Sequence, residues 1–93
     1  MSVERRAATR YPVTWPVELD GGTGVTRNLS ANGVAIETDR VLSEGDSVRF
    51  TVRMPEATEG LSRLLCEGPV VRVEPQGRQW AVAVRFAAVR FEQ

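Results

Sequence analysis

The stretch SVRFTVRM, residues 47–54, alternates strictly between polar and apolar side chains. Val48, Phe50, Val52 and Met54 fall on one side, and the polar residues fall on the other. A period of two is typical of a β-strand that packs one face on a core and exposes the other. The same alternation recurs in residues 13–20 and 80–86. We therefore predict a protein built from half-buried strands.

Short turn sequences separate these strands. Gly, Asp, Asn and Ser gather in residues 20–24, 30–33 and 43–46, and each cluster is typical of a tight connection. Gly68 and Pro69 interrupt a further strand-like run, which indicates a bulge or bend. Residues 87–93 fit either a strand or a terminal helical turn.

We expect about six strands and little or no helix. A small sheet that closes on itself loses its exposed edges, so we predict an all-β fold, a six-stranded antiparallel β-barrel formed by residues 11–93. Residues 1–10 are polar and lack strand periodicity, and we interpret them as a flexible arginine arm. Ninety-three residues allow one such domain.

Composition argues against several classes of function. Twelve basic and 12 acidic residues give a net charge of zero, which disfavours binding to long nucleic acids. The chain has no histidine and a single cysteine, Cys66, expected as a buried thiol. We therefore predict no enzyme, no catalytic residues, no metal site and no cofactor. No apolar run suggests a signal peptide or a membrane span, and we expect a cytoplasmic protein.

All 12 basic residues are arginine, and three of them lie in the N-terminal arm at Arg5, Arg6 and Arg10. Guanidinium groups make charge-assisted, often bidentate contacts with phosphates and also stack on purine faces. The plainer alternative is a solvated basic terminus. Arg72, Arg78, Arg85 and Arg90 could flank such a site, but we interpret them as members of solvated strand faces.

The second candidate feature is the turn NLSANG, residues 28–33. Asn28 and Ser30 can hydrogen-bond to backbone or ligand, and Gly33 tolerates a positive φ or a close approach. Taken by itself, the segment is more typical of a structural turn between strands.

Together the two features resemble the PilZ family. Its signature joins an RxxxR arm to a [D/N]xSxxG turn, and this chain matches both, with an additional arginine before the arm motif. The similarity continues through Tyr11-Pro12-Val13 and through residues 80–86, and so covers most of the chain. The matching residues are Arg6 and Arg10 in the arm, Asn28, Ser30 and Gly33 in the turn, and Arg5 as the extra arginine.

The resemblance implies a six-stranded barrel that binds cyclic di-GMP, commonly as an intercalated dimer of the ligand. Arg6 and Arg10 would hold phosphates and guanines, with Arg5 adding charge. Asn28 and Ser30 would contact a guanine, and Gly33 would allow close approach. The sequence departs from the family pattern at Ala83, where many relatives carry glycine, and in its short C-terminus.

Two alternatives remain. A PilZ-type adaptor that binds a protein and no nucleotide is one, although such domains usually lack one of the two motifs. A barrel for single-stranded nucleic acid, using Trp15 and Trp80 for stacking, is the other, but zero net charge disfavours it. We expect a receptor that signals through a separate downstream protein.

Overall fold

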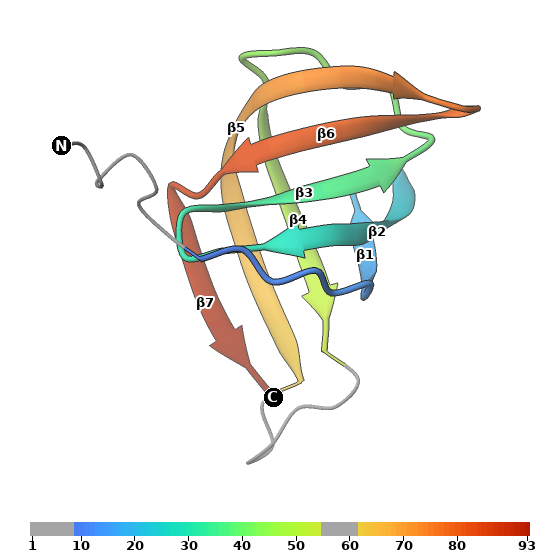
Figure 1. Ribbon diagram of the computed structural model, residues 1–93. Helices are drawn as coiled ribbons and strands as arrows, with labels where there is room; N and C mark the ends of the chain where they lie inside the picture. Colours follow the sequence, from blue (N-terminus) through green and yellow to red (C-terminus); the bar gives the residue numbers. More distant parts are fainter. Residues whose placement is uncertain (1–8, 55–61) are drawn as a thin grey trace, which may run out of the picture.

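The computed structural model describes residues 9–54 and 62–93 of the chain, and every regular element in these ranges is a β-strand (Figure 1). No helix occurs among these residues, and so none that is long and apolar enough to cross a membrane. The strands are β1 (Pro16–Leu19), β2 (Gly22–Leu29), β3 (Gly33–Thr38), β4 (Ser47–Arg53), β5 (Arg63–Gln76), β6 (Gln79–Arg85) and β7 (Ala88–Glu92).

The strands form one antiparallel sheet in the order β4-β1-β2-β3-β6-β5-β7, and an additional pairing between β4 and β5 closes it. The prediction of a six-stranded antiparallel barrel is confirmed, with β7 added as a seventh strand outside the ring. The segment left open between strand and helical turn, residues 87–93, is therefore a strand over most of its length.

The long strand β5 has different partners along its length. Residues 63–69 pair with β4 on one edge, and residues 63–67 pair with β7 on the other. Residues 70–76 pair with β6. A Cβ atom at Gly68 would collide with the carbonyl oxygen of Arg85 and lie 2.9 Å from the amide nitrogen of Ala87. Glycine at this position lets the chain pass from β6 to β7 directly over β5.

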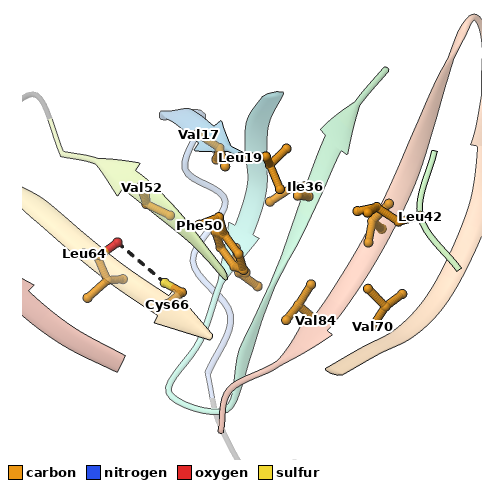
Figure 2. Close-up of a cluster of buried hydrophobic side chains, with 12 residues drawn as sticks. Val17, Leu19, Ile36, Leu42, Phe50, Val52, Leu64, Cys66, Val70 and Val84 are labelled. Atoms are coloured by element: carbon orange, nitrogen blue, oxygen red, sulfur yellow. Dashed lines mark hydrogen bonds between the residues drawn. The ribbon is translucent and has the colours of Figure 1, made fainter. Parts of the chain in front are cut away.

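The core lies inside the ring, where alternate side chains of β1, β3, β4, β5 and β6 converge (Figure 2). Trp15 and Trp80 pack against it half-buried, as the alternation in their segments predicts. Cys66 is 2% exposed, as expected from its apolar surroundings. Burial raises the pKa of the Cys66 thiol from 9.0 to about 12. The buried apolar set is Val17, Leu19, Val34, Ile36, Leu42, Phe50, Val52, Leu64, Cys66, Val70, Val82 and Val84.

Candidate functional site

The turn between β2 and β3 is organised by Ser30. Its hydroxyl oxygen lies 3.2 Å from the amide nitrogen of Asn32 and 3.3 Å from that of Gly33, and accepts a hydrogen bond from each. The amide of Ser30 donates to the carbonyl oxygen of Gly33 at 2.9 Å. Serine suits this position because a short hydroxyl side chain can satisfy nearby backbone amides. The turn therefore has a fixed shape before any ligand arrives.

Gly33 joins this turn to β6. In the pairing of β3 with β6, Gly33 lies opposite Arg85. A Cβ atom at position 33 would collide with the carbonyl oxygen of Val84, the residue before Arg85 in β6. The amide of Phe86 donates to the carbonyl of Asn32 at 2.8 Å, which holds the turn from the same side. Gly33 does not have a positive φ, which the structure shows at Gly21, Gly45 and Gly77 instead. Close backbone approach is the reason for glycine at position 33.

Asn28 lies on the outer face of the barrel, just after a bulge in β2. The register with β3 shifts between Thr26 and Asn28, so Arg27 is the extra residue. Asn28 pairs with Ala35, whose neighbour Ile36 is fully buried, and Ala35 therefore faces outward. The bulge places Asn28 and Arg27 on the same outward side.

The Arg27 guanidinium is held by two polar partners on this outer face. Its Nη1 lies 3.1 Å from a carboxylate oxygen of Glu37 and donates to the side-chain oxygen of Gln76 at 3.2 Å. Gln76 ends β5, which is three strands from β2 in the sheet. A contact across that span shows that the hairpin of β5 and β6 curls over the face next to Asn28.

A row of paired residues crosses this face from Asn28. Asn28 pairs with Ala35, Ala35 with Ala83, and Ala83 with Arg72, so that strands β2, β3, β6 and β5 each supply one member. The two central members carry only methyl groups. The middle of the row therefore has only small side chains above the sheet, with the amide of Asn28 at one end and the guanidinium of Arg72 at the other.

The N-terminal segment meets the turn at Tyr11. Tyr11 and Leu29 form an antiparallel bridge, with N–H···O distances of 2.7 and 2.9 Å. In an antiparallel bridge the residue before one partner lies opposite the residue after the other, so Arg10 lies beside Ser30. Arg10 is exposed. Arg5 and Arg6 lie outside the residues that the structure describes.

Of the six predicted site residues, the structure thus brings four to one side of the barrel, namely Arg10, Asn28, Ser30 and Gly33. Arg72 is exposed, as a residue of a solvated strand face should be, and strand pairing also aligns it with Asn28, beside the candidate site. No sequence signal marks this alignment, because 43 intervening positions and two register shifts separate the two residues.

Metal binding finds no support in this region. Among residues 9–54 and 62–93, no group of three Cys, Asp or Glu side chains is arranged to hold a metal ion. The outer face presents arginine, amide, hydroxyl and methyl groups, together with the Glu37 carboxylate that pairs with Arg27. The arginine, amide and methyl groups suit a flat, polar, anionic molecule.

A family model of the PilZ domain matches residues 4–93, which include the arm, the turn and every strand. The chain belongs to the PilZ family. PilZ domains are regulatory receptor modules, and the family is known for binding cyclic di-GMP. A comparison with curated protein sequences finds no significant match.

The PilZ fold is also evident from a solved structure. The Bacillus subtilis inhibitor of motility, MotI/DgrA, superposes with a TM-score of 0.79 at 21% sequence identity. The match covers 95% of this chain and 45% of that protein. At this level of identity the similarity concerns the fold, and this chain spans less than half the length of its structural neighbour.

Proposed function

We propose that this PilZ domain is a cyclic di-GMP receptor in which the N-terminal arm closes over a ligand held against the outer face of β2, β3 and β6. The observation that carries the proposal is the bridge between Tyr11 and Leu29. Through it, the last arginine of the RxxxR motif lies beside the serine of the NxSxxG motif. The bridge thus lies between Arg10 of the first motif and the second motif, which begins 18 positions later at Asn28.

The arginines of the arm and the polar residues of the turn would have different chemical roles. Arg10, together with Arg5 and Arg6, would neutralise the two phosphates of the ligand and stack on its guanines. The amide of Asn28 would hydrogen-bond to a guanine edge. Ser30 already satisfies two backbone amides, so its main contribution is to hold the turn in shape.

The row beyond Asn28 fits a flat ring. Ala35 and Ala83 carry side chains small enough for a purine to lie against the sheet, and Arg72 stands at the far end. A guanidinium there can contact the edge of the ring or a phosphate. We therefore add Arg72 to the proposed contacts. An intercalated ligand dimer would engage both the arm and this end of the row.

Signalling would follow from the arm. Closing residues 1–10 over an anionic ligand would change the charge and shape of one side of the barrel, and a separate partner protein would recognise that change. The similar fold of an inhibitor of motility supports a regulatory output of this kind. Binding should weaken as salt is raised, because solvent-exposed arginine–phosphate contacts are screened.

The test is direct titration of cyclic di-GMP into the folded protein by calorimetry at low salt. Wild type should bind cyclic di-GMP. The affinity of Arg10→Ala should be at least about tenfold lower, because that is the loss expected when one charge-assisted hydrogen bond is removed. Arg53→Ala is the matched control, because Arg53 is an exposed arginine on β4 that pairs with Glu18 on β1, away from the arm and the turn. Folded wild type that shows no binding would overturn the proposal and favour the protein-binding adaptor.

A further inference from the structure

One strand of the structure has a partner on one edge alone. Among the described residues, β7 pairs with β5 and with no other strand. Figure 1 shows it at the margin of the barrel, beside the first half of β5. Val89 is 46% exposed and Phe91 is 58% exposed, both high for such side chains in a strand. The outer edge of β7 therefore offers unpaired backbone groups next to exposed apolar side chains.

A second open edge lies on the C-terminal half of β5, and its sequence is less suited to pairing with another chain. Residues 71–76 pair with β6 alone, but this stretch contains a register shift at Val71 and a proline at Pro75. Bulges and prolines are features by which proteins prevent an edge strand from pairing with another chain. The pairing of β7 with β5 runs through five consecutive residue pairs without a shift, and β7 contains no proline. Of the two edges, β7 is the one suited to accept a strand.

We propose that β7 pairs antiparallel with β7 of a second copy of this chain, about a two-fold axis that passes Phe91. The sheet β4-β5-β7 would then continue into the same three strands of the second copy. A symmetric pair of this kind uses one patch twice and closes on itself, so it stops at a dimer. The proposal does not depend on nucleotide binding.

The register between the two copies of β7 follows from the charges of Arg90 and Glu92. Val89 and Phe91 lie opposite Cys66 and Leu64 and share their face, so Arg90 and Glu92 project from the other face. An axis at Phe91 places each Arg90 opposite Glu92 of the second copy, twice over. An axis at Arg90 would instead place two arginines opposite each other, which is destabilising. Opposite charges therefore select the Phe91 register.

That register also gives the apolar face a partner. The two Phe91 rings would lie directly across from each other, and paired aromatic side chains are favourable across antiparallel strands. Each Val89 would lie opposite Gln93. Arg90 and Glu92 form an ion pair within one strand at 3.1 Å, so both side chains are already directed toward the same region.

Charge exchange tests the pairing by sedimentation over protein concentrations up to millimolar. Wild type should dimerise, and Arg90→Glu or Glu92→Arg alone should weaken dimerisation by about tenfold or more, because each places like charges in two cross-strand pairs. An equimolar mixture of the two single variants should recover the dimer as a heterodimer, since both cross-strand pairs between the copies are then complementary again. The ion pair of Glu92 with Arg63 in its own chain, 3.4 Å long, is lost in Glu92→Arg and is not restored by mixing. Arg49→Glu is the control, because it breaks an exposed ion pair with Glu67 on strands already paired within the barrel.

A thiol placed at the axis checks the register. Phe91→Cys should form an intermolecular disulfide, because directly opposed residues of antiparallel strands have Cα atoms about 4.5–5.5 Å apart. Val89→Cys should not, since four residues of offset separate the two copies by about 13 Å. A chain that stays monomeric, or a dimer that ignores the charge exchange, would overturn the proposal.

Discussion

Thr26 holds Trp15 through a buried hydroxyl. The amide of Trp15 donates to the Thr26 hydroxyl oxygen at 2.8 Å, and that hydroxyl donates to the carbonyl of Val13. Thr26 itself is 1% exposed. These bonds, with the bridge between Tyr11 and Leu29, lay residues 11–15 along β2. The course of residues 11–15, which follow the arm in the chain, is thus set from inside the core.

Thr26→Val should therefore weaken cyclic di-GMP binding although it touches no ligand. Losing the hydroxyl leaves a buried amide and carbonyl without their partner, at a cost of about 1–3 kcal/mol in unfolding free energy. Thr38→Val is the matched control, because Thr38 is equally buried and its hydroxyl bonds the backbone of Thr23 and Arg40, away from the arm. Urea unfolding should show similar losses for both variants, and calorimetry should show weaker binding for Thr26→Val alone. Equal affinities would contradict an anchoring role.

Gly33→Ala should destabilise the barrel as well as reduce binding. The new methyl group collides with the carbonyl oxygen of Val84, and relieving such overpacking costs about 1–3 kcal/mol. At Gly22 a Cβ would meet nothing closer than 3.5 Å, so Gly22→Ala serves as the control and should leave the folded barrel intact. Thermal melts of both variants without ligand make the comparison. A Gly33→Ala protein as stable as wild type would leave ligand approach as the reason for this glycine.

Arg72→Ala should lower affinity for cyclic di-GMP by about tenfold, because the guanidinium at the end of the Asn28 row loses its contact. Stability should change little, since the ion pair of Arg72 with Glu74 is exposed and 3.9 Å long. Arg53→Ala is the control, as Arg53 is a comparably exposed arginine paired with Glu18 on β1, away from the row. Titration calorimetry would separate the two. Unchanged affinity in Arg72→Ala would confine the site to the arm and turn.

The free energy of unfolding should decrease above pH 9 because the Cys66 thiol is buried in the folded protein. Its pKa is 9.0 in the unfolded chain and about 12 in the barrel, so below pH 9 the thiol is protonated in both states. Between these values the unfolded chain releases the proton first, and the unfolding free energy falls by up to about 1.4 kcal/mol per pH unit.

Urea titrations at several values between pH 8 and 11 would measure this loss. Cys66→Ala should be less stable than wild type below pH 9 because it leaves a cavity, and its decline above pH 9 should be shallower than that of wild type. Parallel curves for the two proteins would show that the thiol does not ionise differently in the two states.

Several features of the fold could be predicted because they are local. The alternation in residues 47–54 specifies a strand with one buried face, and Phe50 and Val52 are buried as that pattern requires. The glycine and polar clusters mark turns for the same reason, since their backbone preferences act within a few residues. Residues 87–93 could not be assigned, because β7 depends on pairing with β5, more than 20 residues earlier.

The candidate site also has local features and features that depend on long-range strand pairing. The amino-acid sequence by itself determined which chemical groups are available, namely an arginine arm and an Asn-Ser-Gly turn whose internal hydrogen bonds span only three residues. Only the tertiary structure decided that Arg10 lies beside Ser30, that Arg72 aligns with Asn28, and that β7 has a partner on one edge alone within the part of the chain that the structure describes. The physical reason is that strand register is set by long-range backbone pairing and by bulges, and side-chain pattern alone leaves the pairing partner unspecified.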